Sequence, residues 1–241
     1  MKFYLGVHHP RWLATAGVPL FVSRRRLTSV KTLPRAVESW ALDSGGFSEL
    51  SLFGTWRTTA REYVAEVRRY QEEIGRLDFA APQDWMCEPP MLAKTGLTVA
   101  EHQRRTIANY LDLRTLAPDL PFIPVLQGWS MWDHIRHAEQ YEAAGVSLAA
   151  LPLVGVGTVC RRQNLTSTGS LFAWLHGDGV KLHGFGVKIT GLRQSQQLLA
   201  SADSMAWSLN ARMNRPMPGH AHASCANCLE WALDWRRSIV Q

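Results

Sequence analysis

The chain has 241 residues, of which 46% are hydrophobic and 19% are charged. This length and apolar fraction suit one globular domain of the size of an α/β barrel. The sequence has no run of eighteen apolar residues to cross a membrane, and its N-terminus lacks the apolar segment and cleavage site of a secretory signal. We therefore expect a cytoplasmic protein without a membrane partner.

Net charge and cysteine content narrow the class of protein further. The formal net charge is +6 at pH 7, and the four cysteines are too few for a disulfide scaffold, which favours a reducing compartment. Arginines occur as a triplet at 24–26 and as pairs beginning at 68, 104, 161 and 236. Such clusters suit a polyanion, but solvated helix faces explain the pairs at 68 and 104 equally well.

Eight short segments have the composition of β-strands: 2–7, 19–23, 40–43, 78–82, 121–127, 147–154, 181–186 and 203–208. Helical periodicity lies between most of them, over 58–76, 98–116, 130–144, 164–176 and 191–201. The unit between the first two strands is short and poorly helical. Strands that alternate with helices predict parallel pairing, and eight units favour a closed (β/α)8 TIM barrel. We expect a single domain over 1–241, with the barrel over 1–212 and a tail over 213–241.

Polar residues gather where the predicted strands end. They are Asp43, Gln83, Asp84, Gln127, Gly155, Gly157 and His183, and Asp203 opens the eighth predicted strand. Because the active site of a barrel lies at the carboxyl ends of its strands, we expect these residues to converge. Three carboxylates with a carboxamide, glycines that admit a close ligand, and the rings of Phe47 and Trp129 predict a pocket for a planar heterocycle. Each residue alone is explained as well by a turn or a helix cap.

The tail contains a metal-binding pattern. His220, His222, Cys225 and Cys228 fall within nine positions, and a Cys-x-x-Cys beside two histidines is a strong zinc signal. Four nitrogen and sulfur ligands leave no position for water, so we expect a structural Zn2+. The alternative is a helix-capping Cys-x-x-Cys without metal. The apolar residues that follow predict a helix that packs back on the barrel.

The order of the motifs resembles that of the tRNA-guanine transglycosylase superfamily. "LDSGGF", "PQDWMCEP", "VLQGW", "LPLVGVG", "HGFGVK" and "ADSMAWSLNAR" follow one another over roughly residues 1 to 212. The short length and the "VGVGTVCRR" and "CANC" stretches look closer still to the 7-deazaguanine DNA transglycosylases of phages and bacteria. The tail departs from the usual zinc site of that superfamily, which uses three cysteines and one histidine.

The resemblance implies a pentosyltransferase that replaces guanine in a nucleic acid with a 7-deazaguanine base. It implies Asp203 as the nucleophile that forms a glycosyl-aspartate intermediate and Asp43 as the general acid/base. Asp84, Gln127 and the backbone donors around Gly155 and Gly157 would read the base edge. Phe47 would stack on the base, and His183 would face it where the superfamily usually has a methionine. The order of the motifs, rather than any single motif, carries these expectations.

The resemblance also implies the partners. We expect DNA as the polymer, 7-cyano-7-deazaguanine or a similar free base as the second substrate, and a bacterial cell or phage-infected host as the setting. Partner proteins or a homodimer remain open. Candidates for holding backbone phosphates are Arg161, Arg162, Lys188 and Arg212, which lie beside the motifs. Three alternatives remain: the same reaction on tRNA, a hydrolytic N-glycosidase, and a barrel that binds nucleic acid without catalysis.

Overall fold

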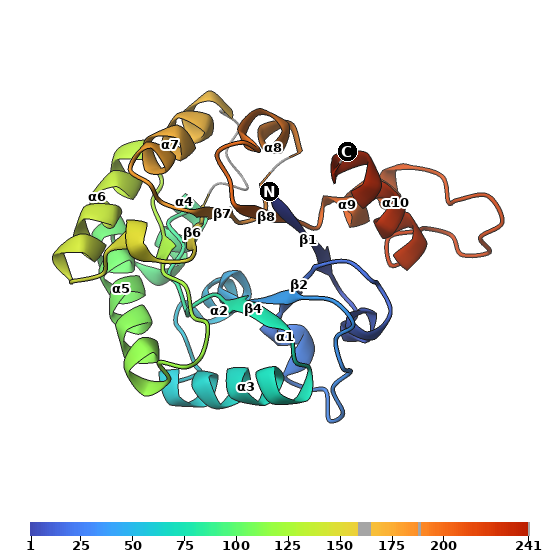
Figure 1. Ribbon diagram of the computed structural model, residues 1–241, viewed down its shortest axis with the longest axis horizontal. Coiled ribbons are helices and arrows are strands. Elements are labelled where there is room, and N and C mark those ends of the chain that lie inside the picture. Colours follow the sequence, from blue (N-terminus) through green and yellow to red (C-terminus); the bar gives the residue numbers. More distant parts are fainter. Residues whose placement is uncertain (159–164, 188, 241) are drawn as a thin grey trace.

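The computed structural model describes residues 1–158, 165–187 and 189–240, except the side chains of 165–167. This part of the chain forms one parallel sheet of eight strands in the order β4-β3-β2-β1-β8-β7-β6-β5. The strands are β1 (Lys2–Val7), β2 (Leu20–Ser23), β3 (Trp40–Asp43), β4 (Leu77–Ala80), β5 (Val125–Leu126), β6 (Val154–Val156), β7 (Leu182–Gly184) and β8 (Ser201–Ser204). The sheet is curled, and helices lie outside it (Figure 1).

The helices follow the strands along the chain. They are α1 (Arg24–Leu27), α2 (Gly46–Phe53), α3 (Ala60–Glu73), α4 (Pro89–Thr95), α5 (Val99–Leu116), α6 (Met131–Ala143), α7 (Leu165–Gly177), α8 (Ile189–Ser195), α9 (Ala206–Met213) and α10 (Leu229–Val240), with short 3-10 turns η1 (Pro10–Ala14) and η2 (Leu148–Ala150). N-terminal capping by side chains explains where some of these helices begin. Thr59 begins α3 and Ser130 begins α6, each in a reciprocal capping box with an acidic residue three positions on.

The two ends of the sheet, β4 and β5, meet through a single parallel bridge between Ala80 and Phe122. Ala80 N–H donates to the Pro121 carbonyl at 3.0 Å, and Ile123 N–H donates to the Ala80 carbonyl at 3.2 Å. Pro121 and Pro124 have no N–H to donate, which keeps β5 short. The eight-stranded parallel α/β sheet is confirmed, and full closure of the barrel stays a prediction.

Several predicted boundaries are wrong. The strand expected over 147–154 is η2 and a turn, with β6 beginning at Val154. The strand expected over 203–208 is instead the end of β8 followed by α9, because small buried residues precede Asp203 and an amphipathic stretch follows it. Asp203 therefore lies near the carboxyl end of β8, as Asp43 lies at the end of β3. Helices α2 and α4 were not predicted.

The C-terminal helix α10 packs on the first strand. It contacts α9 and β1, the rings of Phe3 and Trp235 lie 6.3 Å apart, and Arg236 donates to the Phe3 carbonyl at 3.3 Å. After β1 the chain forms only the 3-10 turn η1, so α10 covers a part of the sheet that a full helix would otherwise cover. None of the described helices has the length and apolar composition needed to span a bilayer.

Candidate active site and metal centre

A cavity of about 320 Å³ lies at the carboxyl ends of the strands. Asp43 reaches it from β3, Asp84 from the segment after β4, Gln127 from the residue after β5, and Asp203 from β8. These four polar residues line one cavity although 160 positions separate the first from the last. The convergence follows from the parallel sheet, since all its strands end on one face.

A tight turn positions Asp43. Gly45 has φ of +81°, a conformation that favours glycine, and it precedes the first residue of α2. The Gly45 N–H and the Ser23 hydroxyl donate hydrogen bonds to the Asp43 carboxylate. Burial raises the pKa of Asp43 above its usual value, and the charge of Asp203 acts in the same direction, while the two hydrogen bonds oppose the shift. Burial therefore favours the protonated form of Asp43 more than water would.

Asp84 and Gln127 form a buried pair. Gln127 Nε2 donates to Asp84 Oδ2 at 2.5 Å, and Ser44 Oγ donates to Asp84 Oδ1 at 3.2 Å. Burial raises the pKa of Asp84 to about 7, against the lowering effect of Gln127, and the charge of Asp43 adds to the rise. Asp84 thus changes charge in the physiological range.

The hydrogen bonds continue from Gln127 to Thr158 and Glu88, two lining residues that the sequence did not indicate. Thr158 Oγ1 lies 2.5 Å from Gln127 Oε1 and 3.4 Å from Glu88 Oε2, and it accepts the Cys87 N–H at 3.2 Å. Thr158 has φ of +57°, which is rare for a β-branched residue. The Gln127 amide is thereby fixed with Nε2 toward Asp84 and Oε1 toward Thr158.

The Asp203 carboxylate contacts the backbone of Gly186 and the ring of His183. Its Oδ1 accepts the Gly186 N–H at 2.9 Å and lies 3.3 Å from His183 Nε2. His183 is not in the described lining of the cavity, and its contact with a base stays a prediction. His183 is fully buried, accepts or donates at Ser201 Oγ through Nδ1 at 2.8 Å, and packs within 4.6 Å of the Phe185 ring centroid. It lies in the layer beneath the cavity and contacts the carboxylate instead.

Gly155 lies in β6 and Gly157 follows that strand, and the N–H groups of both have backbone partners. The Gly155 N–H donates to the Pro124 carbonyl and the Gly157 N–H to the Leu126 carbonyl, both at 2.9 Å. These two N–H groups therefore pair with backbone carbonyls, and donation to a base by the backbone around Gly155 and Gly157 stays a prediction. A Cβ on Gly157 would lie 2.3 Å from Gln127 Nε2. Gly157 thus gives room to the amide of Gln127.

Apolar side chains form the walls of the cavity. Phe47 lines it and is 39% exposed, as a ring that stacks on a ligand at the mouth would be. Trp129 is not in the described lining. The sequence missed Phe21, Met86, Phe185 and Met205. No periodicity distinguishes these side chains from core residues before the curvature of the sheet is known.

The described basic candidate is Arg212, which is exposed on α9. Burial lowers the pKa of His8, and the charges of Arg26, His9 and Arg212 lower it further. Positive charge therefore gathers beside the carboxyl ends of β1 and β8. The other three candidates, Arg161, Arg162 and Lys188, lie outside the described residues.

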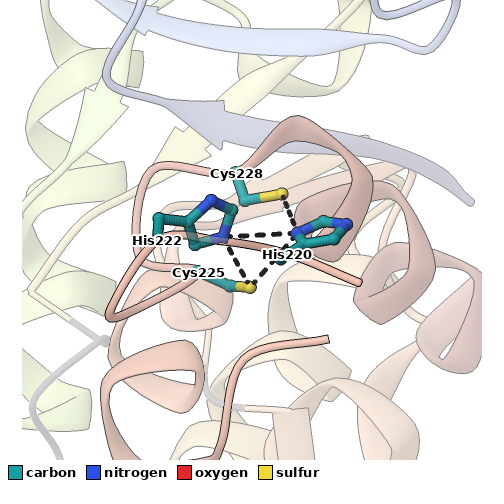
Figure 2. Close-up of side chains that lie close together, drawn as sticks. All are labelled: His220, His222, Cys225 and Cys228. Carbon is teal, nitrogen blue, oxygen red and sulfur yellow. Dashed lines mark hydrogen bonds between the residues drawn. The ribbon is translucent and has the colours of Figure 1, made fainter. Parts of the chain in front are cut away.

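The four tail residues converge on one point (Figure 2). The potential ligand atoms of His220, His222, Cys225 and Cys228 lie within 4.8 Å of one another. His220 Nδ1 is 3.3 Å from His222 Nε2 and 3.6 Å from Cys228 Sγ, and His222 Nε2 is 3.0 Å from Cys225 Sγ. Tetrahedral ligands at about 2.0 Å for nitrogen and 2.3 Å for sulfur stand roughly 3.3–3.8 Å apart. The donor set therefore fits Zn2+.

Outer contacts support this cluster. His220 Nε2 lies 3.0 Å from Glu230 Oε2 on α10, so the carboxylate can accept the N–H of a histidine that binds metal through Nδ1. The Met217 N–H donates to Cys225 Sγ at 3.4 Å. Cys87, by contrast, does not belong to this cluster. It is buried, and burial raises the pKa of its thiol well above the usual range. Burial thus disfavours the thiolate form of Cys87.

The fold and site together define an α/β protein with a carboxylate-rich cavity at the carboxyl edge of a parallel sheet. Over residues 1–241 the chain matches the family model described as "DpdA: DeoxyPurine in DNA protein A". The chain belongs to this family, as the motif order in the sequence indicated. No curated protein matches the chain.

Solved structures show distant likeness. A putative isomerase from Sinorhizobium meliloti has 13% identity and a TM-score of 0.46, over 84% of this chain and 49% of its own. A fructuronate-tagaturonate epimerase from Cohnella laeviribosi has 11% identity and a TM-score of 0.42, over 88% and 60%. The chain thus spans about half the length of the first isomerase. We draw no inference about this chain from structures at such TM-scores.

Proposed function

We propose that the protein exchanges guanine in DNA for a 7-deazaguanine base through a covalent glycosyl-aspartate intermediate. Membership of the family supports DNA modification. The observation that carries the mechanism is that Asp43 from β3, Asp203 from β8 and Asp84 from the segment after β4 line one cavity. This arrangement supplies a nucleophile, a proton carrier and a base-reading carboxylate within one pocket.

In the first step, an Asp203 carboxylate oxygen bonds to C1′ as the C1′–N9 bond of guanine breaks. Asp43, whose pKa burial raises, gives its proton to the departing base. In the second step, the carboxylate of Asp43 takes the N9 proton of the incoming base, and N9 bonds to C1′ as the Asp203 ester breaks. Two in-line displacements retain the configuration at C1′. The Gly186 N–H and His183 hold the Asp203 carboxylate in place throughout.

Asp84 and Gln127 would read the guanine edge. The ionised Asp84 would accept from N1–H and the 2-amino group, and the hydrogen of Gln127 Nε2 that is not donated to Asp84 would donate to O6. A base inside a duplex cannot reach such a cavity, so the target nucleotide must flip out at a cost of a few kcal/mol. Phe47 at the mouth would recover part of this cost by stacking on the base.

The metal cluster stands apart from these steps. His220, His222, Cys225 and Cys228 would hold Zn2+, and the ion would supply a fixed cross-link between the loop after α9 and the start of α10. Since the ligands lie in the tail and not in the lining of the cavity, this site serves the fold.

The test is base exchange with purified, zinc-loaded protein. Duplex DNA and tRNA, each labelled in guanine, are incubated separately with 7-cyano-7-deazaguanine, and both label release and mass-spectrometric incorporation are measured. Release with incorporation into DNA is expected. Incorporation only into tRNA would move the proposal to that polymer, and release without incorporation would indicate hydrolysis.

Asp203→Asn tests the nucleophile. This change preserves size and the acceptor of the Gly186 N–H but removes the attacking carboxylate, so exchange falls by at least about 10³-fold and no covalent adduct forms. Denaturing gel shift of labelled DNA checks the adduct. An adduct that survives in the variant would assign the nucleophile to another residue.

A further inference from the structure

Three basic side chains at the carboxyl edge of the sheet have no task in the steps above. His8 follows β1, Arg26 lies on α1 directly after β2, and Arg212 lies on α9 after β8. Strand β1 lies between β2 and β8, so the three residues follow neighbouring strands. Both arginines are exposed, and none of the ion pairs among the described residues includes either of them. Within this part of the chain, two positive charges are thus left without an acidic partner.

Contacts with α9 fix the ring of His8. Its Nε2 lies 3.2 Å from Ser208 Oγ, and the Ser208 hydroxyl donates to the Ala226 carbonyl at 2.9 Å. Because the hydroxyl hydrogen is used in this way, Nε2–H is the donor to Oγ, and Nδ1 has no hydrogen-bond partner among the described residues. The ring also packs edge-on against Trp207, with the centroids 5.9 Å apart. Ser208 and Arg212 are four positions apart on α9, so they share one face of the helix.

The electrostatics of His8 supports the same grouping. Burial lowers the pKa of His8 the most, and the charges of Arg26, His9 and Arg212 lower it further. A ring on which three separate cations act lies in a region of positive potential. Such a region attracts an anion, and a bound phosphate would offset the repulsion among these side chains.

The basic group of His8, Arg26 and Arg212 borders the cavity. The two residues before His8 line it. The residue before α1 donates a hydrogen bond to the Asp43 carboxylate, and β8 carries Asp203 and leads into α9. The basic group therefore lies beside the two carboxylates that are proposed to act on the sugar and on the departing base.

The order of the strands places the phosphates of a bound nucleotide on this side. In the order β4-β3-β2-β1-β8-β7-β6-β5, β1 and β8 lie in the middle, whereas β4 and β5, which lead to Asp84 and Gln127, lie at the two ends. The bridge between β4 and β5 brings these ends together, so they lie across the cavity from β1 and β8. On the proposed function, the base points to Asp84 and Gln127 and its sugar to Asp203. The phosphates attached to that sugar then lie on the side of β1 and β8.

We propose that His8, Arg26 and Arg212 form a site for the two phosphodiester groups on either side of the target nucleotide. This inference rests on the proposed function and names a binding site for the backbone of its polymer substrate. Each arginine presents several N–H donors, and protonated His8 donates from Nδ1. Phosphate oxygens accept such hydrogen bonds, and the contact positions the strand without reading its sequence. The sequence indicated only Arg212 for this role.

Neutral phosphate analogues test the site without catalysis. A labelled thymidine strand with one central deoxyguanosine is bound to zinc-loaded Asp203→Asn, the parent protein, at about pH 6.5, and fluorescence anisotropy measures Kd. In a second strand, methylphosphonates replace the two phosphodiesters that flank the deoxyguanosine. In a third strand, they replace two distant phosphodiesters. We expect the parent protein to bind the second strand about tenfold more weakly than the third.

Variants connect this loss to the basic group. In the double variant Arg26→Gln and Arg212→Gln, we expect the unmodified strand to bind about tenfold more weakly and the second and third strands to bind alike. His8→Gln gives an intermediate ratio. The matched control is Lys181→Gln, which removes one exposed positive charge at the amino end of β7, the opposite edge of the sheet. It keeps the ratio of the parent protein.

The outcomes separate this site from the proposed reaction. The site is overturned if the double variant keeps the ratio of the parent protein, if the parent protein binds the second and third strands alike, or if it binds none of the strands. An effect seen only with the corresponding RNA strand overturns DNA as the source of the phosphates. Exchange of guanine by the wild type without the effect of the flanking phosphates keeps the reaction and removes the site. The effect without release of guanine from DNA or tRNA keeps the site and removes the reaction.

Discussion

At the scale of single residues, the ionisation of Asp84 would link the proposed recognition of the base to pH. Burial raises its pKa to about 7, so the carboxylate that would accept from N1–H and the 2-amino group is lost as pH falls through this value. We predict that the affinity for 7-deazaguanine falls roughly tenfold for each pH unit below about pH 6.5. Calorimetry from pH 8 to pH 5.5 measures it, and an affinity independent of pH would exclude this role for Asp84.

The same group affects stability with a defined sign. Because its pKa is raised on folding, the stability it contributes is full below the unfolded value of about 4 and is lost as pH rises through about 7. Asp84→Asn has no titrating carboxyl group at this position, so its free energy of unfolding does not fall in this way as the pH rises. We predict that the variant gains about 2–3 kcal/mol relative to wild type between pH 5 and pH 8. Urea unfolding measures this gain, and Asp112→Asn, an exposed change on α5, is the control and shows no such gain.

Gly155 is a second residue whose replacement we expect to change stability, because there is no room for a side chain at this position. A Cβ there would lie 2.4 Å from Phe185 Cε2, inside the packed interior. We predict that Gly155→Ala destabilises the fold by roughly 1–3 kcal/mol and weakens base binding, because Phe185 also lines the cavity. In the control Gly169→Ala, the nearest atom is Ser195 Oγ at 3.7 Å, and stability is kept or improved. Equal urea midpoints for the two variants would contradict the packing argument.

At the scale of elements, the start of α10 is tied to the metal cluster through Glu230. We predict that Glu230→Ala weakens Zn2+ binding about 10–100-fold, because His220 loses the carboxylate that accepts its Nε2–H. Competition with a chelating dye measures the affinity. Asp234→Ala, which removes only an exposed pair with Arg237 on the same helix, is the control. Should both variants bind zinc as the wild type does, Glu230 has no role at the site.

The elements also show what the sequence can and cannot predict. Strand β1, which contains Phe3, Tyr4 and Val7, has the predicted bounds, and so does the apolar β3. The last strand was displaced because Ser201–Ser204 has no β-branched or aromatic residue, so pairing with β1 and β7 rather than propensity places it. Asp203 was nevertheless identified, because the motif that contains it is recognised from its residues alone and does not depend on the bounds of the strand.

Part of the candidate site depends on contacts that no spacing encodes. Asp43, Asp84 and Gln127 follow strand ends and were expected together. Glu88 and Thr158 enter the cavity from loops 70 positions apart and are joined by side-chain hydrogen bonds. His183 was predicted to face the base. Successive side chains on a strand alternate between the two faces of the sheet, and the stagger of neighbouring strands sets how deep each side chain lies. His183 packs against the rings of Phe79 and Phe185.

At the scale of the whole molecule, the parallel sheet explains why so short a chain can gather the site. Every strand contributes its carboxyl end to one face, so the packing of the core and the site occupy opposite ends of the same elements. The weak places are the single bridge between β4 and β5 and the thin cover over β1. The tail supplies that cover through α10, and a metal ion held by His220, His222, Cys225 and Cys228 would fix the loop that leads to it.

Removal of zinc should therefore release α10 and weaken the molecule at β1, next to the strand that carries Asp203. Ligand binding at 1,000 times Kd is worth about 4 kcal/mol, which for a chain of this size corresponds to a fall in Tm of roughly 10 °C on chelation. Hydrogen exchange should quicken over Leu229–Val240 and β1 but not over α3, which packs on the far side against α5. If the chelated protein melts at the same temperature, or α3 and α10 respond alike, the tail does not stabilise the sheet through its metal.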